Sequence, residues 1–250
     1  MMNMNKQEIL KILKKYDFDK DQILILSGAS MVVNDIKEKT ADIDIAVSKE
    51  YEKQLLKKYN CLSKKTNNNN VYQIENIIEF SQNYYDYDYD IIEGYKFQKP
   101  TEIIKLKKTL NREKDKHDIK LIQNYLILKN TNSLSLAYLG DSIYELYIRK
   151  HLLSKGIVKV KQLQKEAIKY VSAKGQGTFL DIMINDNFFS DEEIKIIKRA
   201  RNHKSHGNKT TNIITYKKST GLEALIGYLY LKNNKKRIEE IINYITERRI

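Results

Sequence analysis

The stretch "LSLAYLGDSIYELYIRKHLL", residues 134–153, has the apolar spacing of a long helix and carries a Gly-Asp pair in its middle. On such a helix Asp141 and Glu145 lie one turn apart on one face, in line with Ala137. The opposite face carries apolar side chains that we expect to pack in a core, namely Leu139, Ile143 and Leu146. Because the apolar face has its own partners, the acidic face needs a separate explanation.

A second apolar stretch, "STGLEALIGYLYL" at 219–231, carries Glu223 near its start. Two carboxylates brought together from two apolar helices would repel each other unless a divalent cation lay between them. Oxygen ligands of this kind suit Mg²⁺, which could activate a water molecule against a phosphodiester. The alternative is that Glu223 stabilises the N-terminal end of its helix while Asp141 faces solvent. The residue types alone leave both interpretations open.

The pattern of the chain changes near residue 130. Helical periodicity predicts six helices after this point, at about 133–153, 159–171, 173–185, 191–201, 219–232 and 235–247. Ser133 and Ser190 are the expected N-caps, and Glu193 completes a capping-box pattern with Ser190. The second half, 131–250, is therefore predicted to be all-helical, and "LILKNTNS" (126–133) is the expected linker.

The first half, 1–128, alternates short apolar runs with helix-like segments, which favours an α/β domain. The runs lie at 23–26, 41–47, 71–74 and 77–80, and the helix-like segments at about 5–16, 50–60 and 101–128. The segment "KTNNNN" (65–70) is typical of a loop between strands. "QNYYDYDYD" (82–90) fits either a strand with tyrosines on one face or an exposed loop.

Composition excludes several classes of protein. The single Cys61 rules out an intramolecular disulfide and a CxxC zinc site, so a reducing, cytoplasmic setting is expected. The start "MMNMNKQEILKILKK" lacks the pattern of a signal peptide, and no run of 18 apolar residues predicts a transmembrane helix.

Positive charge is concentrated in the second half. Residues 131–250 carry 22 Lys or Arg against 12 Asp or Glu, whereas residues 1–130 carry 23 against 20. The segment 195–220 holds eight basic residues and no acidic one, which suits a polyphosphate backbone. The alternative is a solvated basic loop without function.

Three blocks of the second half resemble the Mini-ribonuclease III family, the short bacterial ribonucleases III without a separate double-stranded-RNA-binding domain. The blocks are "LSLAYLGDSIYELYIRKHLL" (134–153), "RARNHKS" (199–205) and "YKKSTGLEALIGYLYL" (216–231), in the family's order. The resemblance implies an all-helical homodimer with Mg²⁺ centres that cut opposite strands of an RNA duplex. It also implies a role in maturing the ends of 23S ribosomal RNA precursor.

Carried onto this chain, the resemblance makes Asp141 the catalytic aspartate and Glu223 the helix carboxylate that binds Mg²⁺. Glu145 falls at a position that is commonly acidic in the superfamily and is a further candidate metal ligand. Full-length ribonucleases III have two more acids, where this chain has Ala137 and Thr220, as the short family does. Fewer ligands predict a modest affinity for the metal.

The resemblance also assigns the basic segment to RNA. The loop from Arg201 to Lys209 resembles the family's RNA-contacting loop, which would recognise duplex shape and phosphates rather than bases. His203 and His206 are interpreted as RNA-facing rather than catalytic. The expected RNA-binding residues are Lys198, Arg199, Arg201, Asn202, Lys204, Lys209, Lys217 and Lys218.

A different motif marks the first half. "LSGASMVVNDIKEKTADIDIAV" (26–47) is similar to the nucleotidyltransferase superfamily: a strand, a Gly-Ser turn, a short helix and an Asp-x-Asp strand. The two-residue period of a strand puts Asp42 and Asp44 on one face, where they could hold Mg²⁺ on a nucleoside triphosphate. The candidate site also includes Gly28 and Ser30 near the phosphates and Glu79 on a neighbouring strand.

The Asp-x-Asp pair could instead be surface aspartates at a strand end, and many such domains only bind nucleotides or serve as adaptors. "REKDKHDIKLI", with Lys114, Lys116 and His117, is expected to begin a helix that closes this domain.

Three functions follow from the sequence. The leading one is a Mg²⁺-dependent endoribonuclease that acts on double-stranded or structured RNA. The second is a nucleotidyltransferase whose basic helical domain presents RNA to it. The third is a non-catalytic RNA-binding protein.

Overall fold

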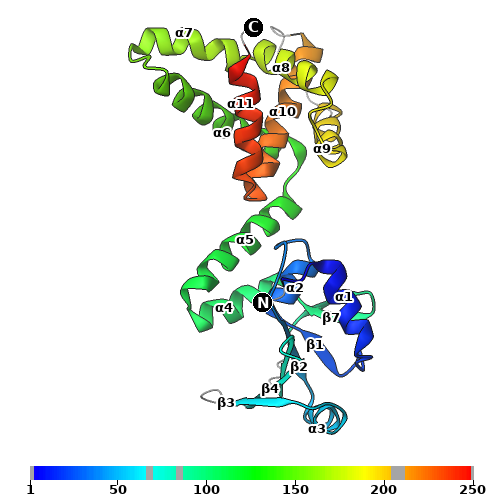
Figure 1. Ribbon diagram of the computed structural model, residues 1–250. Helices are drawn as coiled ribbons and strands as arrows, with labels where there is room; N and C mark the ends of the chain where they lie inside the picture. Colours follow the sequence, from blue (N-terminus) through cyan, green and yellow to red (C-terminus); the bar gives the residue numbers. More distant parts are fainter. Residues whose placement is uncertain (1–2, 66–69, 83–86, 204–211, 249–250) are drawn as a thin grey trace. The chain divides into compact units, whose positions relative to one another are not determined.

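The computed structural model describes residues 3–65, 70–82, 87–203 and 212–248. Contacts group the chain into two compact units, Met1–Leu126 and Ile127–Ile250. The first unit mixes strands and helices and the second is helical, which confirms the predicted fold classes (Figure 1). None of the helices in the described ranges is long and apolar enough to cross a membrane.

A mixed sheet forms the centre of the first unit. In the described part of the chain it has seven strands in the order β3-β4-β5-β2-β1-β7-β6. The strands are β1 (Ile23–Ile25), β2 (Ile43–Val47), β3 (Leu62–Lys65), β4 (Asn70–Ile74), β5 (Ile78–Ser81), β6 (Tyr89–Ile92) and β7 (Tyr95–Gln98). The pairs β2–β5 and β1–β7 are parallel, and the other neighbours are antiparallel. The buried apolar residues of β1 and β2 make these strands the core of the sheet.

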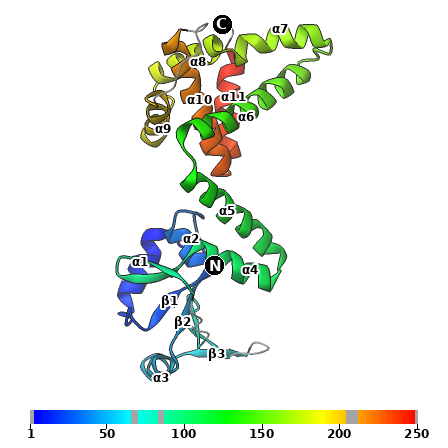
Figure 2. The same cartoon turned by 180° about the vertical axis from the view of Figure 1, so that it is seen from behind.

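The first unit also contains helices. They are α1 (Lys6–Lys15), α2 (Ser27–Val33), α3 (Lys49–Lys58), α4 (Pro100–Leu110) and α5 (Glu113–Asn130). Helix α1 begins with a capping box between Asn5 and Glu8 and buries Ile9 and Leu13 in the core of the sheet. Figure 2 shows α1 next to α2, with which it is in contact.

The single helix predicted at 101–128 is two helices. Asn111 adopts a left-handed backbone (φ 47°), which ends α4 after Leu110, and α5 starts at Glu113. Asparagine tolerates this conformation better than most residues, so the break is marked by residue type but not by periodicity. The helix expected to begin in "REKDKHDIKLI" is confirmed as α5.

β3 and β7 had no prediction of their own, because each is only four residues long and mixes polar with apolar residues, whereas a strand was one of the two interpretations of the stretch in which β6 begins. The loop predicted at 65–70 lies between β3, which ends at Lys65, and β4, which begins at Asn70. Its residues 66–69 lie outside the described part of the chain. Of the stretch 82–90, residues 83–86 lie outside it too, and Tyr89 begins β6.

The second unit is a bundle around α10. Its helices are α6 (Ser133–Ser154), α7 (Val160–Val171), α8 (Ala173–Asn185), α9 (Asp191–Arg201), α10 (Ile213–Leu231) and α11 (Lys235–Glu247). Helix α10 contacts α6, α8, α9 and α11, and its residues from Ser219 to Gly227 are buried except Glu223. All six predicted helices are confirmed, although α10 begins at Ile213 rather than near residue 219.

Two predicted boundaries of this unit are wrong. The N-cap of α6 is Asn132, whose side chain accepts from the backbone N–H of Ser135, whereas Ser133 is already inside the helix. The predicted linker 126–133 is mostly the last turn of α5, which runs to Asn130 because Leu126, Leu128 and Lys129 are good helix formers. The predicted capping box of α9, between Ser190 and Glu193, is confirmed.

Candidate active site

Two glycines allow α6 and α10 to cross with their backbones in contact. A Cβ placed on Gly140 would lie 1.8 Å from the carbonyl oxygen of Glu223, and one on Gly227 would lie 2.1 Å from the carbonyl oxygen of Leu136. Real Cβ atoms do not approach other atoms this closely, so neither position accepts a side chain without movement of a helix. The crossing explains Gly140, and it fixes the next residue, Asp141, beside the turn that carries Glu223.

The carboxylates of Asp141 and Glu223 interact across this crossing. Burial, followed by the negative charge of Asp141, raises the pKa of Glu223 to about 7. Burial, followed by the charge of Glu145, also raises the pKa of Asp141. The structure thus brings together two acids that are 82 positions apart in the chain, as the sequence argument requires of them.

Gln176 of α8 is a third polar residue at this place, and it was not among the predicted site residues. Its side chain is 1% exposed and lowers the pKa of both Asp141 and Glu223. Nevertheless, neither atom of its amide completes a hydrogen bond of normal geometry with a described residue. One sequence signal could have found it: Gln176 shares a helix face with the apolar residues Leu180 and Met183, so it had to be a buried amide.

The remaining positions of the acidic face of α6 differ in their surroundings. Glu145 accepts from the Arg149 guanidinium at 2.5 Å, one helical turn away. Ala137 is buried in a small apolar cluster. The expectation that Leu146 packs in the core is wrong, because its side chain is 64% exposed, on the outer side of the helix. Thr220, which replaces the other missing acid, is buried and donates to the Tyr216 carbonyl at 3.0 Å.

The donor set fits a divalent cation that prefers oxygen ligands. Across the ranges that the structure describes, no group of three or more His, Cys, Asp or Glu side chains could hold a metal ion. The site instead offers two mutually repelling carboxylates and a buried amide whose oxygen is also a suitable ligand. A cation between the carboxylates would remove the repulsion that raises the pKa of Glu223.

The predicted RNA-binding residues that the structure describes lie at the end of α9 and in the first half of α10. Lys198, Arg199 and Asn202 are exposed at the end of α9, and Arg201 is half-buried against Gly221 of α10. Arg199 donates from Nε to the Ser133 hydroxyl at 3.1 Å, which ties the end of α9 to the start of α6.

Two further predicted RNA-binding residues are on α10. Lys217 is half-buried, and Lys218 pairs with Asp181 of α8 at 2.5 Å, so its charge is partly neutralised. Lys204, Lys209 and His206 lie outside the described residues.

The predicted acidic site of the first unit is brought together by parallel strands. Asp44 of β2 lies opposite Glu79 of β5 in the register of the sheet. Burial, and then the charges of Asp42 and Glu79, raise the pKa of Asp44 to about 7. Glu79 is also paired with Lys64 at 2.6 Å and accepts from Gln73 at 3.2 Å.

The predicted phosphate-side residues contribute to the fold. Ser30 is fully buried and its hydroxyl donates to the Gln98 carbonyl at 2.6 Å, so this group is already engaged. A Cβ on Gly28 would lie 2.7 Å from the Thr40 hydroxyl, which places Gly28 against the segment that precedes Asp42.

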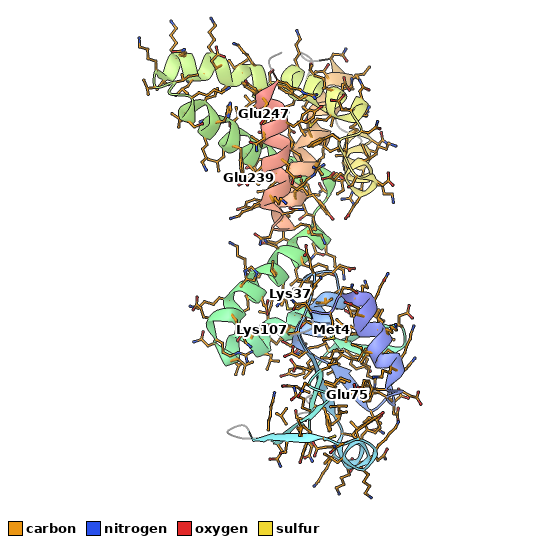
Figure 3. The ribbon with its side chains drawn as sticks, viewed as in Figure 1. Met4, Lys37, Glu75, Lys107, Glu239 and Glu247 are labelled. Carbon is orange, nitrogen blue, oxygen red and sulfur yellow. The ribbon has the colours of Figure 1, made fainter. Side chains whose placement is uncertain are left out.

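Two lysines act on the carboxyl group of Asp44. The positive charges of Lys107 and Lys114 partly offset the rise in the pKa of Asp44. Lys107, labelled in Figure 3, is itself buried and pairs with Asp115 at 3.1 Å and Asp118 at 2.8 Å.

Comparison with known proteins places the second unit in a family. Residues 134–234 match the Ribonuclease III domain. The chain is 40% identical over 118 residues to Mini-ribonuclease 3 of Streptococcus pneumoniae, covering 47% of this chain and 92% of that protein. It is 45% identical over 117 residues to Mini-ribonuclease 3 of Enterococcus faecalis, covering 46% of this chain and 89% of that one.

A crystal structure of a Fusobacterium nucleatum protein is 36% identical, covers 48% of this chain and 96% of that chain, and has a TM-score of 0.44. The range that matches the Ribonuclease III domain, 134–234, contains Asp141, Gln176 and Glu223. Through this half, the chain belongs to the Mini-ribonuclease 3 family, within the ribonucleases III.

Proposed function

We propose that the protein is an endoribonuclease that cleaves double-stranded RNA, with Asp141 and Glu223 as its catalytic carboxylates. The observation that carries the proposal is the close crossing of α6 and α10 at Gly140, where burial and then the charge of Asp141 raise the pKa of Glu223. Perturbed acids that face each other are typical of catalytic sites. The names of the relatives, which are ribonucleases, support the reaction class.

The cofactor of this reaction is Mg²⁺. Asp141 and Glu223 would hold it, with Glu145 one turn away as a further ligand or a residue that orients water. When bound, the cation would supply an activated water for attack on the phosphodiester. The protein itself contributes the fixed spacing of the two carboxylates, which the helix crossing at Gly140 imposes.

The substrate is a duplex of the ribosomal RNA precursor, and the proposed product is the mature end of 23S ribosomal RNA. Support for RNA binding comes from the exposed Lys198 and Arg199 at the end of α9. Together with Arg201 and Lys217 they could contact phosphates, which position a duplex without reading its sequence. Lys204 and Lys209 belong to the same proposed surface by sequence.

The acting species is a homodimer, because cleavage of both strands of a duplex requires two active sites. An apolar groove between α6 and α7 supports this part of the proposal. Its lining includes Leu153, Val160 and Ile168, which are all more than half exposed. A second copy of the chain would bury these side chains.

The test is cleavage of a blunt RNA duplex by the full chain in Mg²⁺ and in EDTA. Double-strand cuts in Mg²⁺ alone are expected, and Asp141→Asn should abolish them while the duplex is still bound in a gel-shift assay. If the wild type binds the duplex but does not cleave it, the nuclease proposal is wrong and the protein is a non-catalytic RNA-binding protein.

A nucleotidyltransferase reaction in the first unit is a second candidate. The register of Asp44 with Glu79 and the pKa of about 7 for Asp44 favour it, because they describe a carboxylate cluster on the adjacent parallel strands β2 and β5. Asp42 and Asp44 would then hold Mg²⁺ on a nucleoside triphosphate. Incorporation of labelled nucleotide into RNA, lost in Asp42→Asn/Asp44→Asn and retained in Asp141→Asn, is the result that would support this reaction.

A further inference from the structure

We propose that Gln176 completes the cation site as a positioning residue, with its amide placed between the carboxylates of Asp141 and Glu223. The inference rests on the proposed function, which supplies the cation, and it adds a residue that is not an acid. It also makes the site a product of three helices, α6, α8 and α10, rather than two.

The first observation is an amide with no partner in an enclosed place. Gln176 is 1% exposed, yet among the described residues neither its oxygen nor its nitrogen has a hydrogen-bond partner. A buried amide without partners destabilises a fold, so one that is kept must serve something else or be satisfied by a ligand. Weak side-chain hydrogen bonding by Gln176, short of normal geometry, lowers the pKa of both Asp141 and Glu223, so these two carboxylates lie beside the amide.

The second observation is that close packing restrains the start of α8, so Gln176 cannot easily move away from the two acids. The Ser172 hydroxyl caps the helix by accepting from the Gly175 N–H at 3.2 Å. A Cβ on Gly175 would lie 2.2 Å from the Lys169 carbonyl oxygen, so the turn from α7 into α8 is closely packed. On the other side, a Cβ on Gly177 would be 3.5 Å from Lys218 of α10. The close backbone contact at Gly175, with ordinary packing at Gly177, limits how far Gln176 can move.

The chemistry of an amide suits this position better than that of a third acid. Another carboxylate would add to the repulsion that already raises the pKa of Glu223. An amide is neutral and has both kinds of group: its N–H can donate to a carboxylate, and its oxygen can face a cation or a water on that cation. Gln176 can therefore gain its missing hydrogen-bond partners when a cation brings the two acids and their water molecules into place.

The test compares wild type with Gln176→Met, which has nearly the same volume and no polar atom. Mn²⁺ serves as the probe, and its binding to the full chain is followed by electron paramagnetic resonance. Binding at this site is defined as the part that Asp141→Asn removes, because the first unit has acids of its own. The melting temperature is recorded in EDTA, and Gln162→Met on the exposed face of α7 is the matched control.

Gln176→Met should weaken Mn²⁺ binding at this site by about tenfold or more, as removal of groups around metal ligands does. Its melting temperature in EDTA should equal or exceed that of the wild type, because an unpaired buried amide is gone. Gln162→Met should change neither quantity. Unchanged Mn²⁺ affinity of Gln176→Met would overturn the inference. If its melting temperature in EDTA were also lower than that of the wild type, Gln176 would be a structural residue.

The cleavage assay separates this inference from the proposed function. If the wild type cuts duplex RNA and Gln176→Met binds Mn²⁺ normally, the role of Gln176 is wrong and the nuclease assignment stands. If Gln176→Met loses Mn²⁺ while the wild type cuts no RNA, the cation site stands and the nuclease assignment fails. If no Mn²⁺ binding depends on Asp141, both are wrong.

Discussion

Gly140 of α6 lies against the carbonyl oxygen of Glu223 of α10, so close that a Cβ would be 1.8 Å from that oxygen. This contact sets the distance between the two helices that carry the proposed catalytic acids. It also accounts for a glycine in the middle of a buried helix, where it lowers helix stability.

The first prediction concerns this contact. Gly140→Ala should lower the free energy of unfolding by about 3 kcal/mol or more, because the methyl group forces the helices apart. Urea denaturation followed by circular dichroism would measure it. The matched control is Gly177→Ala in α8, where the new Cβ meets its nearest atom at an ordinary 3.5 Å. Equal stability of the two variants would contradict the close crossing.

The second prediction concerns catalysis. Glu223→Gln should reduce the rate of duplex RNA cleavage at saturating enzyme by at least about 100-fold, the scale on which single electrostatic groups act in active sites. The control is Glu239→Gln on the exposed side of α11, labelled in Figure 3, which should cleave normally. Loss of activity in both variants would indicate a general effect of charge, not a role of the site.

The third prediction follows from the pKa of Glu223. A carboxyl group with a pKa of about 7 in the folded chain, against 4.5 as its ordinary value, binds more protons folded than unfolded in this range. Stability in EDTA should therefore fall as pH rises from 4.5 to 7, by up to about 3 kcal/mol from this group. Glu223→Gln should reduce the fall, and Mn²⁺ should stabilise the wild type more at pH 8 than at pH 5.5. An identical pH dependence of wild type and variant would refute the assigned pKa.

The fourth prediction concerns RNA binding. In an Asp141→Asn background, Lys198→Ala should weaken binding of duplex RNA to a similar degree for unrelated sequences. It should also reduce the slope of log K against log salt concentration by about 1, as expected for one lost phosphate contact. Lys161→Ala on α7 removes the same charge from another exposed helix and should leave the slope unchanged. An equal change of the salt slope in Lys198→Ala and Lys161→Ala would contradict a specific phosphate contact of Lys198.

The fifth prediction concerns the first unit. Asp44→Asn should stabilise the chain at pH 8 by up to about 4 kcal/mol, because it removes a buried charge whose pKa is raised from 3.8 to about 7. Differential scanning calorimetry would measure it, with the exposed Asp21→Asn as control. RNA cleavage should be unaffected. A less stable Asp44→Asn would mean that its carboxylate is a structural partner and not one of a repelling cluster.

The helical half was predictable from sequence because its helices are long, periodic and well capped, as with Ser190 and Glu193. Asp141 and Glu223 were conspicuous as charged residues in apolar helices, but only the resemblance to the Mini-ribonuclease III family favoured a shared site over two unrelated acids. Gln176 could be placed on the buried face of its helix, but its position beside the two acids could not be predicted, because that depends on the packing of α8 against α10. The steric role of Gly140 likewise depends on a partner 83 positions away.

In the first half, the apolar strands β1 and β2 were predictable, whereas β6 was not. Its residues alternate between exposed and half-buried, so it has no apolar run, and its place in the sheet comes from pairing with β7. The end of α4 at Asn111 was missed for a similar reason, because a left-handed residue interrupts the backbone without changing the apolar period.

The central claim is that Asp141 and Glu223 share one cation, and a double-mutant cycle of Mn²⁺ binding tests it most directly. The full chain would be titrated as wild type, Asp141→Asn, Glu223→Gln and the double variant. If the acids share an ion, each single variant should lose the same binding event, and the double variant should lose no more than either. Losses that add, or a Glu223→Gln variant that retains the Mn²⁺ removed by Asp141→Asn, would show two separate carboxylates and contradict the shared site.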